Sequence, residues 1–177
     1  MICQDTNLGF GKLALNGEDK MAFRIRRLTL DDMDEAARVL RRSFDERLPS
    51  LAGLHTPAED RSYFRDQLFK ESEMWGAFDE QLVGFIAFAD KWIEQLYILP
   101  DRQGQGIGKA LLGIAKEKFP TLKLWTFQQN YLAKRFYEKN GFVPIEETDG
   151  LSNESKAPDV LYEWTTSSSS GILPTVT

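Results

Sequence analysis

The sequence has very little of what metal sites and disulfide-stabilised folds need. Its 177 residues include one cysteine, Cys3, and one histidine, His55. A single cysteine excludes a disulfide or a thiolate metal site within one chain, and a single histidine excludes a multi-histidine site. A Ser-His-Asp triad would have to use His55. We therefore expect a site without metal.

Long apolar runs and a surplus of positive charge are also missing. No run reaches the ~18 residues of a membrane span, and no basic region followed by an apolar stretch opens the chain. We expect a cytoplasmic protein with no membrane partner. The formal net charge is −5. Nucleic acid needs a basic face, so we expect no nucleic-acid partner, and the acidic balance agrees with a cationic one.

The composition that is present suits one globular domain. Hydrophobic residues make up 42% and charged residues 28% of the chain, and the length is enough to bury a sizeable core. Residues 1–20 show no clear periodicity and are predicted to be an N-terminal extension. Residues 167–177 begin as a Ser-rich, low-complexity tail. The domain itself is predicted to span residues 21–166.

Hydrophobic periodicity within the domain predicts a mixed α/β fold with the order β-α-α-β-β-β-α-β-α-β-β. Thr29 with Asp32 marks one helix start, and Thr56, Pro57 and Glu59 mark a second, which should run to about residue 69. The four arginines that follow the first start are expected on a solvated helix face: Arg38, Arg41, Arg42 and Arg47. The four tryptophans are expected to pack on strands: Trp75, Trp92, Trp125 and Trp164.

Residues 103–108, "QGQGIG", put three glycines between a predicted strand and a predicted helix. Bare backbone amides at a helix start can bind a phosphate, although glycines also serve a plain tight turn. A P-loop fails because Gly108-Lys109 is followed by Ala110 and position 103 is Gln. A G-x-G-x-x-G fingerprint fails because Lys109 takes the third glycine's place.

The pattern that fits is Q/R-x-x-G-x-G/A, met by Gln103, Gly106 and Gly108. In its setting, "LYILPDRQGQGIGKALL", the chain resembles the GNAT superfamily of acetyl-CoA-dependent N-acetyltransferases. The later segment "NYLAKRFYEKNGF" resembles a second family motif, with one strand between the two. The resemblance covers about residues 23–165. It implies a GNAT-like acyl-CoA N-acyltransferase fold: a central, mostly antiparallel sheet that is splayed at the cofactor strand, with helices on both faces.

The resemblance also implies where acetyl-CoA binds. Amides of the glycine loop would hold the pyrophosphate, and the preceding strand would pair with the pantetheine arm. This strand, residues 92–98, should therefore separate from residues 121–127. The cofactor-binding residues carried over are Leu96, Tyr97, Ile98, Gln103, Gly104, Gln105, Gly106, Ile107, Gly108, Lys109, Asn130 and Ala133.

Asn130, Ala133 and Tyr137 are spaced to share one helix face. By resemblance this face meets the cofactor, and Tyr137 is the general acid near the thioester sulfur. The alternative is a packed tyrosine with a satisfied hydroxyl. Leu132 and Phe136 are expected in the core.

Glu94 is the candidate base, acting directly or through water, and strand alternation puts it with Leu96 and Ile98. A solvated or salt-bridged strand residue is the alternative. A strand amide near Tyr97 or Ile98 is expected to stabilise the oxyanion. His55 lies in segment 49–56, which in this family often lines the acceptor pocket; otherwise it is a loop residue.

The resulting expectation is an N-acetyltransferase that transfers the acetyl group of acetyl-CoA to a primary amine of a small molecule or peptide. The reaction would be a direct attack, with Tyr137 as general acid. The alternative is a non-catalytic acyl-CoA-binding or regulatory module on the same fold. A homodimer is compatible with either function.

Overall fold

The structure is a computed structural model that describes residues 23–166. The expected extension 1–20, the expected tail 167–177 and Cys3 lie outside the described residues, so the domain boundaries stay predictions. Within residues 23–166, none of the helices combines the length and the apolar character needed to span a bilayer.

The strands and helices of residues 23–166 follow the order predicted from the sequence, except that the second of the four predicted helices is divided into α2 and α3. The sheet has seven strands in the order β1-β2-β3-β4-β5-β7-β6. Along the chain the elements are β1 Arg24–Arg27, α1 Met33–Arg47, α2 Pro57–Tyr63, α3 Phe69–Glu71, β2 Glu73–Phe78, β3 Leu82–Ala89, β4 Trp92–Ile98, α4 Ile107–Lys118, β5 Thr121–Phe127, α5 Tyr131–Lys139, β6 Val143–Thr148 and β7 Asp159–Thr165.

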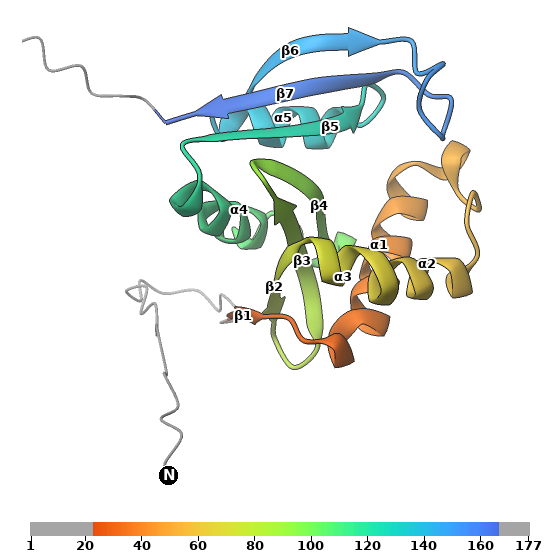
Figure 1. Cartoon of the computed structure of the whole chain (residues 1–177), viewed down its shortest axis with the longest axis vertical. Coiled ribbons are helices and arrows are strands. Elements are labelled where there is room, and N and C mark those ends of the chain that lie inside the picture. Colours follow the sequence, from red (N-terminus) through yellow and green to blue (C-terminus); the bar gives the residue numbers. More distant parts are fainter. Residues whose placement is uncertain (1–22, 167–177) are drawn as a thin grey trace, which may run out of the picture.

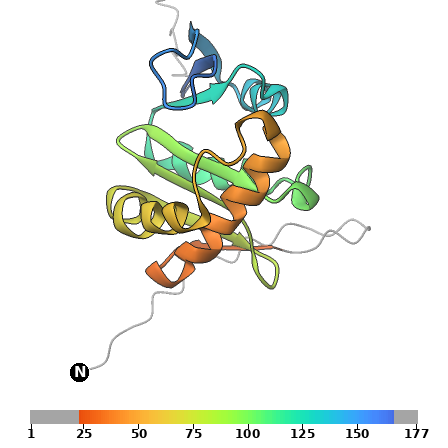
Figure 2. The ribbon, with the colours of Figure 1, turned by 90° about the vertical axis from the view of Figure 1, so that its right-hand side faces the viewer.

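Neighbouring strands are antiparallel except at one place, where β4 and β5 are parallel. Helices α1–α3 cover one face of the sheet, and α4 and α5 cover the other (Figures 1 and 2). The predicted mixed α/β architecture, with helices on both faces, is confirmed.

Strand β3 shows why this layering follows from the sequence. Its residues Leu82–Phe88 are all buried, because a strand between two helical layers has no solvent face. Phe85 and Ala87 pack in the cluster formed with α1. Ile86 and Phe88 pack in the cluster formed with α4.

Both predicted helix starts are confirmed. The Asp32 carboxylate accepts the Thr29 backbone N–H at 2.8 Å, although a 3-10 turn, Leu30–Asp32, precedes α1. At α2, the Thr56 N–H donates to Glu59 Oε2 at 2.6 Å, and Thr56 Oγ1 accepts from Glu59 N at 3.3 Å. These reciprocal bonds satisfy amides that a helix start leaves without partners.

The second helix is less regular than its periodicity predicts. It ends at Tyr63, continues as a π-helical segment, Phe64–Leu68, and closes as the short α3. The wider π turn keeps both Phe64 and Leu68 buried. Single π turns inside helices are frequent at functional sites, and Phe64 lines the cavity described below.

The expectations for the tryptophans and for the arginines of α1 are each wrong in part. All four tryptophans lie on strands, but Trp125 is 41% exposed, so it is not a core residue. The arginines of α1 are not simply a solvated face, because Arg41 pairs with the buried Asp60 and Arg42 pairs with Asp101. These pairs connect α1 to α2 and to the glycine loop.

Candidate active site

The sheet opens between β4 and β5. Their only paired residues are Trp92 and Lys123, next to a bond from Lys123 N to Lys91 O of 2.8 Å. Beyond this point the two strands diverge (Figure 1). The predicted separation of strand 92–98 from strand 121–127 is confirmed, so backbone groups of the second half of β4 have no partner strand on this side.

Hydrogen bonding on the other side of β4 indicates which groups face the opening. The Leu99 N–H donates to Val83 O of β3 at 2.8 Å. Because successive residues of a strand direct their backbone groups to opposite sides, the amides of Ile98 and Leu96 point to the opening. Tyr97 directs its amide toward β3. Of the two strand amides expected to stabilise an oxyanion, Ile98 is therefore the better placed.

The Ile98 carbonyl is already occupied by the protein. It accepts from Ser43 Oγ of α1 at 3.1 Å and from Gln103 Nε2 at 3.0 Å. Arg47 Nη2 in turn donates to Gln103 Oε1 at 3.0 Å. Ser43 is 5% exposed. Neither Ser43 nor Arg47 is predicted from the sequence, since only the fold brings α1 beside the glycine loop.

The glycine loop follows a 3-10 turn, Pro100–Arg102. Gly104 and Gly106 adopt φ values of +78° and +83°, a region that costs other residues about 1–2 kcal/mol. Gly106 is the N-cap of α4, and no side chain of this cap residue accepts a hydrogen bond from the first backbone amides of the helix. The first bond to this cap runs from Ala110 N to Gly106 O, at 3.0 Å. The amides before Ala110 therefore remain available to an anion.

The third glycine has a different role. A Cβ at Gly108 would lie 3.2 Å from the Phe136 ring of α5. Close packing between α4 and α5 thus accounts for Gly108. The side chain of Ile107 is buried in the core, so only its amide belongs to the site, and Lys109 is exposed beside the loop.

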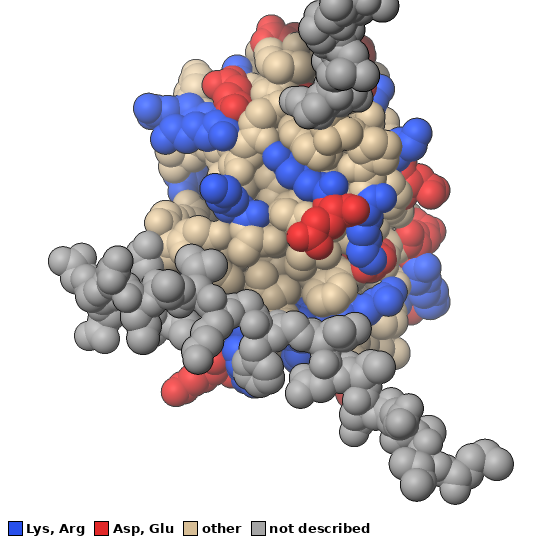
Figure 3. Space-filling model, turned by 90° about the vertical axis from the view of Figure 1, so that its left-hand side faces the viewer, with Lys and Arg blue, Asp and Glu red and all other residues tan. Residues whose placement is uncertain are grey.

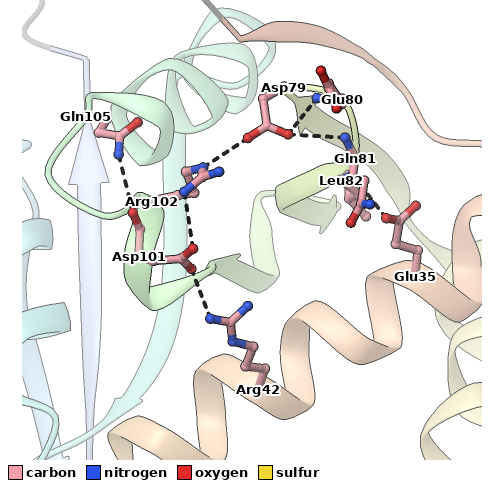
Figure 4. A network of polar contacts seen from close by, with 9 residues as sticks. All are labelled: Glu35, Arg42, Asp79, Glu80, Gln81, Leu82, Asp101, Arg102 and Gln105. Atoms are coloured by element: carbon pink, nitrogen blue, oxygen red, sulfur yellow. Dashed lines mark hydrogen bonds and ion pairs between the residues drawn. The ribbon is translucent and has the colours of Figure 1, made fainter. Parts of the chain in front are cut away.

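Ion pairs fix the 3-10 turn that leads into the glycine loop to two other elements (Figure 4). Arg102 Nε contacts Asp79 Oδ2 of the β2–β3 turn at 2.9 Å, and Arg42 of α1 reaches Asp101 at 3.2 Å. Gln105 Nε2 turns back onto Asp101 O at 3.4 Å. The Gln81 amide and the Arg102 guanidinium hold the pKa of Asp79 below its ordinary value. The start of the glycine loop is thus held by contacts with α1 and with the β2–β3 turn.

Tyr137 of α5 is 7% exposed and lies among aromatic rings. Its ring centroid is 5.3 Å from that of Phe136 and 5.6 Å from that of Phe142. Burial, and next the neighbouring Tyr97, raise the pKa of the Tyr137 phenol well above its ordinary value. The phenol therefore stays protonated at neutral pH.

The hydroxyl of the nearby Tyr162 donates to Glu138 Oε1 at 2.8 Å, so Tyr162 is a packed tyrosine with a satisfied hydroxyl. The Tyr137 hydroxyl is not among the fully buried side-chain atoms of residues 23–166 that lack a hydrogen-bond partner. The role of Tyr137 as a general acid therefore stays a prediction.

The other α5 residues named in the sequence analysis lie in different environments. Asn130 is the N-cap, and its Oδ1 accepts from Ala133 N at 3.2 Å. Ala133 and Phe136 pack against the core. Leu132 is 49% exposed, so its expected place in the core is wrong.

Glu94 does not lie where strand alternation predicts. The β3–β4 register shifts so that Ile93 pairs with Phe88 and Gln95 with Ala87, which leaves Glu94 as a bulge. Partial burial, and next Glu71 of α3, raise the pKa of Glu94. The bulge interrupts the alternation that would put Glu94 on the face of Leu96 and Ile98, and Glu94 is exposed.

A cavity of about 600 Å³ lies between α1, α2 and β4. Gln95 and Tyr97 form its sheet wall, and Phe127 at the end of β5 borders it. Leu51, Leu54 and His55 place the segment 49–56 on this cavity, while Glu94 is outside the lining. That the segment lines an acceptor pocket stays a prediction. Its other lining residues are Leu40, Arg41, Phe44, Asp45, Glu59, Asp60, Tyr63, Phe64, Gln67, Glu154 and Ser155.

Polar contacts hold the cavity wall together. Arg41 Nε donates to Asp60 Oδ2 at 2.8 Å, and Arg41 Nη2 donates to His55 O at 2.6 Å. His55 Nε2 lies 3.6 Å from Glu154 Oε2, so the α1–α2 connection meets the β6–β7 loop. Burial raises the pKa of Tyr97 to about 12.

A second cavity of about 550 Å³ adjoins the first and shares Leu51 with it. Its charged lining residues are Lys134 and Lys156. On the side of the molecule where α4 lies, basic and acidic side chains are interspersed where described residues are visible (Figure 3). Among residues 23–166, no three His, Cys, Asp or Glu side chains gather where they could hold a metal ion.

The fold, with a sheet opened beside a glycine loop, is that of an acyl-CoA-dependent transferase. The family model of the acetyltransferase (GNAT) domain matches residues 70–144. The peptidyl-lysine N-acetyltransferase YjaB of Salmonella typhimurium is 34% identical over 146 residues, covering 80% of this chain and 99% of that protein. This chain belongs to the GNAT family of N-acetyltransferases.

Two further proteins similar to this chain are also N-acetyltransferases. The spermidine N(1)-acetyltransferase of Thermoplasma acidophilum is 31% identical over 154 residues, covering 73% of this chain and 93% of that protein. The crystal structure of the PaiA N-acetyltransferase from the same organism, in complex with coenzyme A, superposes with a TM-score of 0.63 at 28% identity. It covers 82% of this chain and all (100%) of that one.

Proposed function

We propose that this N-acetyltransferase transfers the acetyl group of acetyl-CoA to a primary amine, with Tyr137 as the general acid. The observation that carries the proposal is the opening between β4 and β5, which the braced glycine loop borders. The relatives support an amine acceptor, because they are named for peptidyl-lysine and for spermidine. The coenzyme A complex of a similar structure supports the donor.

The residues present fit acetyl-CoA. The backbone amides before Ala110 would hold the pyrophosphate, with Lys109 beside them. The backbone of Leu96 would pair with the pantetheine amides along the opening, which leaves the Ile98 amide for the acyl group. When bound there, acetyl-CoA supplies an activated acyl group as a thioester.

The chain's own groups then have separate tasks. The Ile98 amide donates to the carbonyl oxygen as negative charge develops on it. Tyr137 donates its proton to the departing sulfur, since its raised pKa keeps it protonated. The amine approaches from the cavity wall formed by Gln95 and Tyr97. Glu94 is outside the lining, so we propose that it accepts the amine's proton through water.

Steady-state release of thiol from acetyl-CoA, with a panel of primary amines, tests the proposal. Tyr137→Phe should lower kcat by about 10²-fold or more, the usual contribution of a general acid, with a KM for acetyl-CoA within about twofold. Tyr162→Phe is the matched control, because it removes a hydroxyl from the same aromatic cluster whose proton is bound to Glu138.

Two results would contradict the proposal. If no amine is acetylated while coenzyme A still binds, the chain is an acyl-CoA-binding module. If Tyr137→Phe and Tyr162→Phe lower kcat equally, Tyr137 is a packing residue only.

A further inference from the structure

The carbonyl of Ile98, the last residue of β4, is bound by two side chains. Ser43 Oγ donates to it at 3.1 Å, and Gln103 Nε2 donates to it at 3.0 Å. A backbone carbonyl oxygen has two lone pairs, so both are in use, and Ile98 offers a ligand its amide alone. Strand β5 supplies neither bond, because it pairs with β4 at Trp92, the other end of the strand. Side chains of α1 and of the glycine loop thus take the place of a neighbouring strand.

The peptide unit that joins Ile98 to Leu99 is held at both of its sides. Opposite the Ile98 carbonyl, the Leu99 N–H donates to Val83 O of β3 at 2.8 Å. Because a peptide unit is planar, bonds at its two sides fix its orientation. Gly84 of β3 lies directly against the same stretch, since a Cβ there would be 2.9 Å from Tyr97 O. The end of β4 is therefore held on β3 in one orientation.

Ser43 reaches Ile98 from the buried face of α1, where it is 5% exposed. The other buried residues of this helix are hydrophobic: Met33, Ala36, Ala37 and Val39. Alanine would pack at this position and favours a helix more than serine does, whereas a buried hydroxyl is costly unless it has a hydrogen-bond partner. What the serine adds is thus its bond to the Ile98 carbonyl.

Arg47, one turn further along α1, acts on the same carbonyl through Gln103. Its Nη2 donates to Gln103 Oε1 at 3.0 Å. A glutamine side chain has one acceptor oxygen and one donor nitrogen, so binding the oxygen from α1 leaves the nitrogen directed to Ile98. Ser43 and Arg47 are four residues apart and share one helix face. One face of α1 therefore fixes the end of β4 by two routes.

This arrangement bears on the reaction because the N–H and the C=O of one strand residue point to the same side. In the proposed reaction, the Ile98 N–H donates to the acyl oxygen as negative charge develops there. A carbonyl without donors at the same residue would direct its own negative end toward that charge and weaken the stabilisation. Two donors on the carbonyl offset this effect, and an amide that is already held in place needs no reorganisation during the reaction.

We infer that Ser43 is a positioning residue for acetyl transfer: its hydroxyl, together with the Gln103 side chain, fixes the backbone of Ile98 so that the Ile98 N–H stays directed to the acyl group. The inference rests on the proposed function for the reaction that Ile98 serves. Ser43 lies in α1, outside both motifs that carry the family resemblance, so its role follows from its contact with Ile98.

Steady-state kinetics of Ser43→Ala tests the inference. We expect kcat to fall about tenfold, because a small displacement of a group that acts in the transition state is costly, with a KM for acetyl-CoA within about twofold. Glu35→Ala is the matched control, since Glu35 Oε1 accepts from Leu82 N at 3.2 Å and ties the same helix to the start of β3 (Figure 4). It should leave kcat within about twofold. Thermal unfolding midpoints show that both variants are folded.

Backbone hydrogen exchange of the ligand-free protein gives a second readout, which needs no turnover. The Leu99 N–H shares its peptide unit with the Ile98 carbonyl, so Ser43→Ala should speed its exchange by about threefold or more. Glu35→Ala should leave this exchange unchanged. Arg47→Met extends the test, because Arg47 is only partly buried. It should lower kcat about threefold and also speed exchange at Leu99.

A folded Ser43→Ala variant with unchanged kcat or unchanged Leu99 exchange would overturn the inference, as would equal losses of kcat in Ser43→Ala and Glu35→Ala. Should Ser43→Ala not fold, Arg47→Met decides in the same way. If the natural sequence acetylates no amine, the proposed function fails, whereas faster Leu99 exchange in Ser43→Ala still supports the positioning of Ile98. Full turnover by Ser43→Ala contradicts only the role of Ser43.

Discussion

Gly106, Gly108 and Gly113 lie within eight positions of the chain but have different physical reasons to be glycine. Gly106 has a φ of +83°, Gly108 packs against Phe136, and a Cβ at Gly113 inside α4 would meet nothing within 4 Å. The sequence alone does not show which of these reasons applies to which glycine. The backbone angle and the neighbour decide which substitution the fold tolerates.

Alanine substitutions should therefore act in opposite directions. Gly113→Ala should raise the free energy of unfolding by about 0.5–1 kcal/mol, because it removes glycine's entropy cost in a helix. Gly106→Ala should lower it by about 1–2 kcal/mol through the left-handed backbone. Gly106→Ala should also raise the KM for acetyl-CoA. Urea unfolding and steady-state kinetics measure both, and a stabilised Gly106→Ala variant would contradict the assignment.

At the scale of elements, the sequence predicted where helices start better than it predicted where single side chains lie. Thr29 with Asp32, and Thr56 with Glu59, start helices because their contacts are between near neighbours in sequence. The bulge at Glu94 depends on β3, a partner strand whose register the sequence of β4 does not contain. Leu132 has helical periodicity, but the fold leaves it 49% exposed.

The start of α1 also connects two elements. Arg26 of β1 donates to both Asp32 carboxylate oxygens, at 2.8 and 2.7 Å. The Arg26 contact, followed by the Thr29 bonds, holds the pKa of Asp32 far below its ordinary value. Such a depressed pKa stabilises the fold above the unfolded-state value of about 4, and the contribution is lost as the pH falls below it.

Asp32→Asn should reduce the free energy of unfolding at pH 7 by about 1–2 kcal/mol. The variant should also lose less stability than the natural sequence between pH 6 and pH 3. Denaturant unfolding across this pH range is the measurement. Asp31→Asn is the control, because Asp31 is exposed and precedes the same helix. An equal pH dependence in both variants would show that the Arg26–Asp32 pair contributes nothing.

At the scale of the whole molecule, the resemblance predicted the open sheet and the glycine loop, but of the cavity beside Tyr97 it indicated only the segment 49–56. The cavity is formed by α1, segment 51–55, β4 and the β6–β7 loop, which are far apart in the sequence. No motif marks Tyr63 or Gln95, because their place in the lining depends on which surfaces the fold brings together. The contacts of Ser43 and Arg47 with Ile98 and Gln103 are equally long-range.

The central claim is that acetyl-CoA occupies the opening between β4 and β5. Backbone hydrogen exchange, with and without coenzyme A, tests it directly. We predict that coenzyme A slows exchange at the amides of Leu96, Ile98 and residues 104–109, whose backbone groups face the opening or the loop. Amides of β1 and β6, at the two edges of the sheet, should change little. Saturating coenzyme A that leaves the β4 and loop amides unprotected would contradict the account.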